Sequence, residues 1–285
     1  MLTFAFGILG LIVGSFLNVV ILRHGKKGIG GRSACPSCGA LIRWHDNIPL
    51  LSWLLLRGKC RACHARISLQ YPLVEAATGI AFAIVGPWAA RLAVPQATQI
   101  PLVAAYLAIA SLFIAIFVYD LYHKIIPDPW VFPLVLLAFA SQLGSPFFVG
   151  SNSWWSLFAG PLTAAPLFAL WLYSRGAWMG FGDVKLSLAI GWLLGPLYGF
   201  VAILFGFVLG AAISVCILLP LPHLIEFARK FGITRLAPTS PGFTMKSEIP
   251  FGPFLIASTF IVWLMLINSI DPLALIGASP HWPVP

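Results

Sequence analysis

Apolar residues follow one another along most of this 285-residue chain, in stretches that charged residues rarely interrupt. Stretches of about 20 such residues have the length of helices that cross a bilayer. The windows lie at 2–22, 72–90, 102–119, 130–148, 154–174, 186–219 and 251–270. The window from 186 is too long for one helix at about 1.5 Å per residue, and Gly195 and Pro196 predict a break within it. The pattern therefore predicts eight membrane-spanning helices joined by short loops.

The amino-acid composition also indicates a membrane protein. The mean hydropathy is +0.95 and only 9% of the residues are charged, which is typical of an all-α polytopic integral membrane protein. The first window has no acidic or basic residue and no positive region ahead of it. We therefore expect a retained span there, and not a cleaved signal peptide.

The 17 basic residues indicate an orientation, because cytoplasmic loops of membrane proteins are enriched in Lys and Arg. With the N-terminus outside, every basic residue except Arg91 faces the cytoplasm. A seven-span arrangement would leave Arg229, Lys230, Arg235 and Lys246 on the opposite side. The net charge of +9 then indicates orientation and attraction to anionic lipids. Nucleic acid is not an expected partner, since no basic domain stands clear of the bilayer.

The first cytoplasmic loop contains two Cys-x-x-Cys pairs, Cys35 with Cys38 and Cys60 with Cys63. Two such pairs match the ligand spacing of a tetrahedral four-thiolate Zn²⁺ site. Two disulfides are the alternative, but disulfides are uncommon in a reducing cytoplasm. A thioredoxin-like redox role would need alternating strands and helices around the pairs, which the sequence lacks. We predict structural zinc, and we expect Cys216, alone in an apolar window, to serve packing.

Four of the eight acidic residues lie at ends of predicted spans: Glu75, Asp120, Asp128 and Asp183. A charged side chain at the centre of a span costs about 2.5 to 3.5 kcal/mol on insertion scales, so acids near hydrocarbon need a reason. In the predicted topology all four lie on the cytoplasmic side, although they come from different helices. Their convergence suggests proton chemistry, either an aspartic dyad or a proton-coupled path.

Acids at helix ends can also be caps or solvated groups. Asp128 suits an N-cap, because a proline follows it at the first helical position. Asp120 does not, because it lies at a helix C-terminus, where the macrodipole disfavours an anion. Asp183 follows Gly180 and Gly182, which permit a close backbone approach or a positive φ just before the helix.

Several motifs together resemble the bacterial prepilin peptidases, or type IV leader peptidases, whose signature is Gly-x-Gly-Asp. The matching stretches are GSFLNVVILR from 14, NIPLLSWLLLRGKC from 47, ISLQYPLVE from 67, YDLYHKIIPD from 119, GFGDVKL from 180 and IPFGPFL from 249. The resemblance implies a catalytic pair, Asp120 and Asp183. The supporting residues that we expect around this pair are Asp128, Gly180, Gly182, Lys185 and Glu75.

This resemblance implies an intramembrane aspartic peptidase that removes the short basic leader from type IV prepilins, or from pseudopilins of type II secretion, after a Gly at the cytoplasmic face. It also implies N-methylation of the new N-terminus with S-adenosylmethionine as methyl donor, with the zinc loop associated with methyl transfer. The expected parts are a first span at 1–22, the zinc loop at 23–70, a peptidase domain at 71–270 and a periplasmic tail at 271–285. The expected location is the bacterial inner membrane, with prepilins and membrane lipids as partners.

The proposed chemistry also suits the residues themselves. Two close carboxyl groups do not readily ionise together, so one would keep its proton while the other deprotonates a water that attacks the peptide carbonyl. A proton-coupled transporter would also place acids in its helices, but it should show internal repeats and sites at the midplane. A zinc-bearing membrane scaffold would leave Asp120 and Asp183 unexplained.

Overall fold

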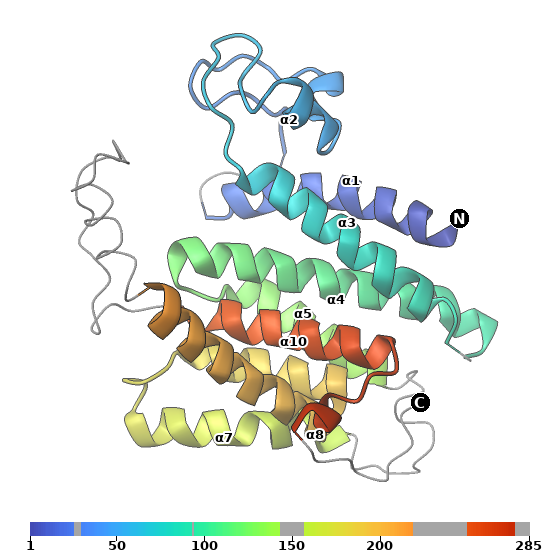
Figure 1. The fold of residues 1–285 in the computed structure, drawn as a ribbon, viewed down its shortest axis with the longest axis vertical. Coiled ribbons are helices and arrows are strands. Elements are labelled where there is room, and N and C mark those ends of the chain that lie inside the picture. Colours follow the sequence, from blue (N-terminus) through green and yellow to red (C-terminus); the bar gives the residue numbers. More distant parts are fainter. Residues whose placement is uncertain (26–29, 93, 143–156, 219–249, 277–285) are drawn as a thin grey trace.

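The computed structural model describes residues 1–25, 30–92, 94–142, 157–218 and 250–276, which form a bundle of apolar helices with a small lobe beside it (Figure 1). The bundle contains α1 (Leu2–Arg23), α3 (Gln70–Ala89), α4 (Gln96–His123), α5 (Asp128–Gln142), α7 (Ala159–Ser174), α8 (Phe181–Ile213), η3 (Ser214–Leu218), α10 (Gly252–Ile267) and η4 (Pro272–Ile276). The lobe, residues 30–69, carries η1 (Trp44–Asn47) and α2 (Leu51–Leu55).

By length and composition alone, four helical segments of the described residues could cross a bilayer: α1, α3, α4 and α8 with its extension to Cys216, although the last of these counts both limbs of a bend. Helix α10 is apolar but has only 16 residues. The windows predicted at 130–148 and 154–174 extend into residues that the structure does not describe. The count of eight spans therefore stays a prediction. The basic residues Arg229, Lys230, Arg235 and Lys246 also lie outside the described residues.

Helix α8 bends back on itself at Gly195, which confirms the predicted break. Gly195 has φ 83° and ψ 168°, far from helical values. A methyl group added to Gly199 would come within 3.1 Å of the Cα of Gly191. In a straight helix these two residues would lie about 12 Å apart along the axis, at about 1.5 Å per residue. Residues 181–194 and 196–213 therefore form a helical hairpin.

Neighbouring helices in the bundle run antiparallel and approach closely at small residues. Gly10 of α1 faces Gly79 of α3, and Gly14 lies against the backbone of Glu75, so residue numbers rise along one helix as they fall along the other. Small residues at such contacts let the helix backbones approach, which is how helices associate where lipid provides no hydrophobic driving force. The hairpin of α1 and α3 thus forms one wall of the bundle.

The same alternation brings several helix ends together. Phe113 of α4 packs against Phe260 of α10, with ring centroids 5.9 Å apart, and the carboxyl group of Asp120 lies against Gly252. The end of α4 therefore meets the start of α10. As Figure 1 shows, the ends of α1, α4 and α7 and the starts of α3, α5, α8 and α10 lie on one side of the bundle, at the left of the view. The expected gathering of acids on one face follows from this arrangement.

The backbone at Gly195 predicts a specific sensitivity to substitution. Its φ and ψ lie in a region that is essentially restricted to glycine, where another residue costs on the order of 1 to 3 kcal/mol. We expect Gly195→Ala to lower the unfolding temperature of the purified protein in detergent. Gly30→Ala is the matched control, because an added methyl group there meets no described atom within 4 Å. Equal unfolding temperatures for the Gly195→Ala and parent proteins would contradict the hairpin geometry.

Candidate active site and cysteine cluster

Asp120 and Asp183 lie together at the end of the bundle where the helix termini gather. Asp120 is in the last turn of α4 and Asp183 is in the first turn of α8, and their side chains are buried, at 4% and 7% exposed. The two carboxyl groups are close enough to interact electrostatically, and α10 packs against both helices. The structure therefore brings together the two acids that the sequence analysis paired.

Glycines at this end leave room for close contacts. Gly252 begins α10, and a side chain there would collide with the carboxyl group of Asp120. Ile126, in the short loop after α4, fills the space beside Gly182 and also approaches Gly252. Gly252 lies in the stretch IPFGPFL, one of the motifs described above, but nothing in the neighbouring sequence linked this glycine to Asp120. Its contact with the acid is visible only in three dimensions.

Asp183 is held at the start of α8 by Gly180. The backbone N–H of Gly180 donates a hydrogen bond to the Asp183 carboxyl group, and the Asp183 N–H donates to the Gly180 carbonyl at 3.2 Å. Neither Gly180 nor Gly182 has a positive φ, so that alternative is wrong. The close backbone approach is confirmed at Gly182, where an added methyl group would lie 3.0 Å from Ile126.

Asp128 forms an ion pair with Lys185, which follows Asp183 by half a helical turn. The N-cap interpretation of Asp128 is wrong, because Asp128 is already the first residue of α5. The carbonyl of Pro127 accepts the first helical hydrogen bonds, including one from Trp130 at 3.1 Å. The carboxylate of Asp128 is therefore free to neutralise Lys185 beside the buried pair.

Glu75 does not join this group. Its carboxylate accepts a hydrogen bond of 2.8 Å from the backbone N–H of Leu50, which belongs to the lobe. Its Cα packs against Gly14 of α1, and its side chain is 7% exposed. Because α3 begins on the same side of the bundle as the other acids, Glu75 shares their side, but it lies apart from Asp120, Asp128 and Asp183 and ties the lobe to the hairpin of α1 and α3.

Aromatic contacts hold the chain beside the buried acids, at the point where it passes from α1 into the lobe. His24, the first residue after α1, packs against Tyr119 and Trp130, with ring centroids 5.2 Å and 4.6 Å away. Tyr119 immediately precedes Asp120, and Trp130 lies in the first turn of α5. The chain therefore leaves the bundle for the lobe next to the acid pair.

The four lobe cysteines form one cluster. The Sγ atoms of Cys35, Cys38, Cys60 and Cys63 all lie within 4.8 Å of one another, and those of Cys35 and Cys63 are 3.8 Å apart. Four sulfurs around a tetrahedral Zn²⁺, with Zn–S distances of about 2.3 Å, are separated by about 3.8 Å. The cluster therefore has nearly the dimensions of a zinc site. All four are free thiols, so the disulfide alternative is wrong.

Both cysteine pairs are presented by the same backbone turn. In the first turn the N–H of Cys35 donates to the carbonyl of Ala40, and in the second the N–H of Cys60 donates to the carbonyl of Ala65. The carbonyl of each first cysteine accepts the N–H four residues later. Two equivalent turns that face each other provide two ligands each, which is the arrangement of a closed structural zinc site.

Within the cluster, the pKa values of Cys35 and Cys63 are shifted in opposite directions. Backbone N–H groups of Cys38 and Ser37 lower the pKa of Cys35 to about 6. The Ala65 backbone lowers the pKa of Cys63, but the neighbouring thiols, Cys38 first, and burial outweigh it and raise this pKa to about 11. Four thiolates repel one another unless a metal ion neutralises them. Divalent zinc would supply that charge.

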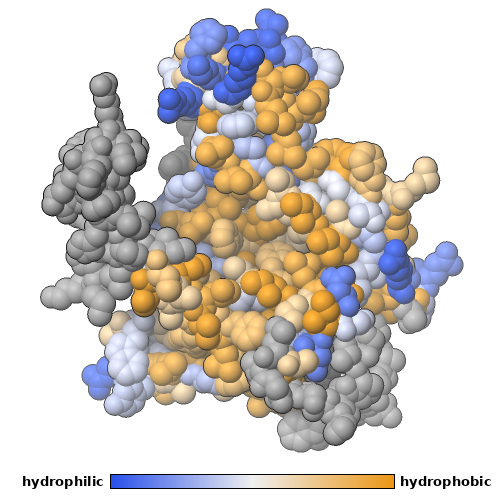
Figure 2. Space-filling model, in the orientation of Figure 1, coloured by the Kyte–Doolittle hydropathy of each residue, from blue (hydrophilic) through white to orange (hydrophobic). Residues whose placement is uncertain are grey.

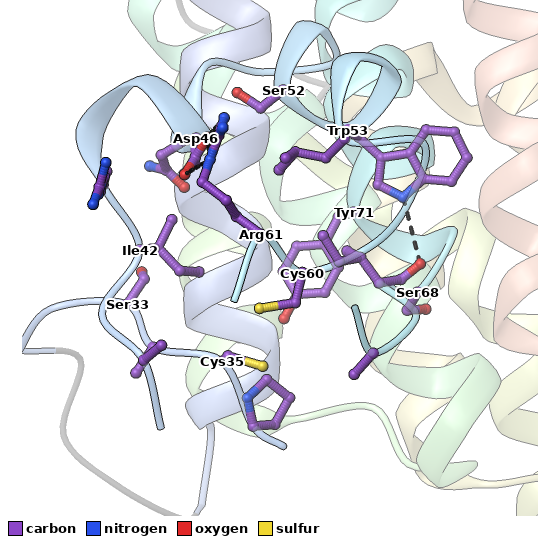
Figure 3. Close-up of a pocket in the computed structure, with 18 of the residues that line it drawn as sticks. Ser33, Cys35, Ile42, Asp46, Ser52, Trp53, Cys60, Arg61, Ser68 and Tyr71 are labelled. Carbon is purple, nitrogen blue, oxygen red and sulfur yellow. Dashed lines mark hydrogen bonds and ion pairs between the residues drawn. The ribbon is translucent and has the colours of Figure 1, made fainter. Parts of the chain in front are cut away.

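A cavity of about 770 Å³ lies between the lobe and the adjoining parts of α1 and α3 (Figure 3). Its lining includes the rings of Trp53 and Tyr71, the thiol of Cys60 and the carboxylate of Asp46. Arg61 donates hydrogen bonds to Asp46 and holds the pKa of that carboxyl below its usual value. A volume of this size is typical of small-molecule sites.

Comparisons with known proteins find relatives over most of the chain. Residues 8–88 match the family model described as Bacterial Peptidase A24 N-terminal domain, and residues 107–215 match the Type IV leader peptidase family. The prepilin leader peptidase/N-methyltransferase of Vibrio cholerae is 36% identical over 67% of this chain and 76% of its own length. Enzymes of that name from Stutzerimonas stutzeri and Pseudomonas aeruginosa are 31% and 30% identical, each over 90% of this chain and 88% of the relative. No solved structure matches the chain.

The cysteine cluster predicts one Zn²⁺ per chain in elemental analysis of the purified protein. Cys38→Ser should lower the zinc content, because loss of one of four thiolates opens the site. Cys216→Ser is the matched control, since Cys216 lies outside the cluster. Full zinc content in a protein that lacks both Cys38 and Cys60 would rule out the assignment.

Proposed function

Because this chain belongs to the type IV leader peptidase family, we propose that it cleaves the leader from type IV prepilins with the carboxyl groups of Asp120 and Asp183. The observation that carries this proposal is the approach of two buried acids from helices far apart in the sequence. The distribution of basic residues would place them at the cytoplasmic face of the inner membrane. Pseudopilins of type II secretion are included in the proposed substrate class.

In the proposed reaction the two carboxyl groups share one proton. The ionised carboxyl removes a proton from a water molecule as the water oxygen attacks the carbonyl carbon of the scissile bond. The protonated carboxyl meanwhile donates a hydrogen bond to the carbonyl oxygen. A proton then passes to the departing nitrogen, the C–N bond breaks, and the products are the leader carboxylate and a new N-terminal amine. No side chain is covalently modified.

The surroundings of the pair support these roles. Gly252 lets α10 approach closely enough to set the position of the Asp120 carboxyl group. The N–H of Gly180 donates to Asp183 and would orient its carboxyl group. Asp128 is engaged in an ion pair at the rim, so it does not act as a third acid. Asp128 and Lys185 thereby neutralise each other beside the acid pair.

We propose N-methylation of the new N-terminus as the second activity, with S-adenosylmethionine bound in the cavity beneath the lobe. When bound, this donor supplies an electrophilic methyl group on its sulfonium. The rings of Trp53 and Tyr71 would stack on the adenine. The carboxylate of Glu75 would attract the positive charge, while Asp46 would hold Arg61 in the lining of the cavity. The zinc cluster would keep the wall of the cavity folded.

The peptidase proposal predicts non-additive effects of substitution. Asp120→Asn or Asp183→Asn alone should remove nearly all cleavage of a prepilin in detergent, and the double substitution should cost little more, because the two acids act as a unit. Asp128→Asn should retain clearly more activity, since Asp128 contacts Lys185 at the rim. Initial rates measure the effect, and retained zinc reports folding. Substantial cleavage by a folded Asp183→Asn protein would defeat the proposal.

If the cavity binds the methyl donor, a substitution in its lining should impair donor binding and methylation without stopping leader cleavage. Tyr71→Ala should weaken binding of S-adenosylmethionine, measured by calorimetry, and should lower methylation of the cleaved pilin while cleavage continues. Tyr71→Phe is the matched control, because it keeps the ring that would stack on the adenine. Unchanged affinity in the Tyr71→Ala protein would exclude this cavity as the donor site.

A further inference from the structure

The lobe exposes a row of large apolar side chains. Leu51, Leu54 and Leu55 of α2 are 50%, 64% and 73% exposed, and Ile48 just before them is 39% exposed. Positions 51, 54 and 55 lie on one face of a helix. We call these four side chains the apolar flank. A contiguous apolar patch on a small hydrophilic lobe indicates a surface that is covered in its native setting.

The apolar flank continues onto the surface of α1. Ile48 and its neighbour Pro49 line a shared groove with Ile12 and Phe16 of α1, and both of these α1 side chains are more than half exposed. Ile12 lies about 16 Å along the helix from Arg23, at about 1.5 Å per residue. The hydrocarbon core of a bilayer is about 30 Å thick. When α1 spans the bilayer, Ile12 lies near its midplane, and the groove opens into the cytoplasmic leaflet.

Figure 2 shows how the lobe divides by polarity. Hydrophilic residues cover its top in this view, and hydrophobic residues cover the flank that continues onto the helical body below. The polar part is strongly basic, because Asp46 is the only acid between residues 30 and 69. Arg57 and Lys59 directly follow α2 and are exposed. Basic residues at the edge of an apolar surface are suited to anionic headgroups.

The backbone of residues 48–52, at the start of the apolar flank, is also suited to lipid, where unpaired polar groups are costly. The N–H of Ser52 donates to the carbonyl of Ile48 at 3.1 Å. Pro49 has no N–H to satisfy. The N–H of Leu50, which begins the turn into α2, donates to the buried carboxylate of Glu75. Glu75 thus satisfies a donor that water would otherwise have to reach.

We propose that the apolar flank is an interfacial anchor that lies in the cytoplasmic leaflet beside α1, with the basic residues of the lobe at anionic headgroups. The partner is the lipid bilayer itself. The anchor fixes the lobe against the cytoplasmic leaflet, beside α1. Anchoring follows from the surface of the lobe and does not depend on either proposed activity.

Photocrosslinking in lipid nanodiscs of phosphatidylethanolamine and phosphatidylglycerol tests the anchor. The crosslinker benzoylphenylalanine replaces Leu54 in one protein, Ile80 in a second and Ala62 in a third. Ile80 is 61% exposed on α3 and is the lipid-facing reference, whereas Ala62 is exposed in the second cysteine turn. Mass spectrometry should find lipid adducts at positions 54 and 80 and not at 62. Adducts at 80 without adducts at 54, or crosslinks from 54 to a second protein chain, would overturn the proposal.

A paired substitution gives an independent readout. Leu54→Gln with Leu55→Gln should speed hydrogen exchange of residues 48–56 in nanodiscs, because a polar flank leaves the acyl chains. Ala62→Gln should leave that exchange unchanged, and zinc content shows whether each lobe is folded. Exchange as slow as in the parent protein, in a variant that retains zinc, would contradict anchoring. If the variant loses zinc, the crosslinking result decides.

Discussion

Unpaired backbone groups and isolated carboxylates are costly in hydrocarbon, and this constraint orders the whole molecule. It confines polar chemistry to the ends of apolar helices that alternate in direction. Asp120 and Asp183 come together because α4 ends and α8 begins on the same side of the bundle. Gly252 joins them because α10 runs antiparallel to α4. Asp128, which also lies at this rim, is neutralised by Lys185. Among the described residues no basic side chain forms an ion pair with Asp120 or Asp183, and a buried carboxyl pair of this kind is suited to proton transfer.

The lobe, with its cysteine cluster and its cavity, adjoins the end of the bundle that carries this pair. His24 packs on the aromatic residues that flank Asp120 and Asp128 in sequence, so the lobe departs from the bundle beside the acids. The cysteine cluster and the cavity then lie along α1 and α3. In the proposed sequence of reactions, a new N-terminus formed at the acid pair would have a short path to the methyl donor. Lipid anchoring of the apolar flank would keep that path in the plane of the membrane surface.

Features that depend on local spacing could be predicted from the sequence. The spacing of Cys35, Cys38, Cys60 and Cys63 indicated one cluster because two tight turns determine where the sulfurs can lie. The alternation of spans placed the four expected acids on one side of the bundle, where three of them form one group and Glu75 lies apart. Side-chain contacts between distant helices could not be predicted, because periodicity indicates which faces are apolar and not which residues meet. Three such contacts were missed: Glu75 with Leu50, Gly252 with Asp120, and the lobe with the exposed side of α1.

The central claim is that Asp120 and Asp183 share one proton and act as a single catalytic unit. The most direct measurement is the pH dependence of kcat/KM for prepilin cleavage, with the parent and Asp128→Asn proteins in nanodiscs. A pair that needs one protonated and one ionised carboxyl gives a bell-shaped profile with two apparent pKa values, which belong to the pair. The account predicts this bell in both proteins, because Asp128 pairs with Lys185 outside the unit. A profile without an acidic and a basic limb, or the loss of one limb in the Asp128→Asn protein, would contradict it.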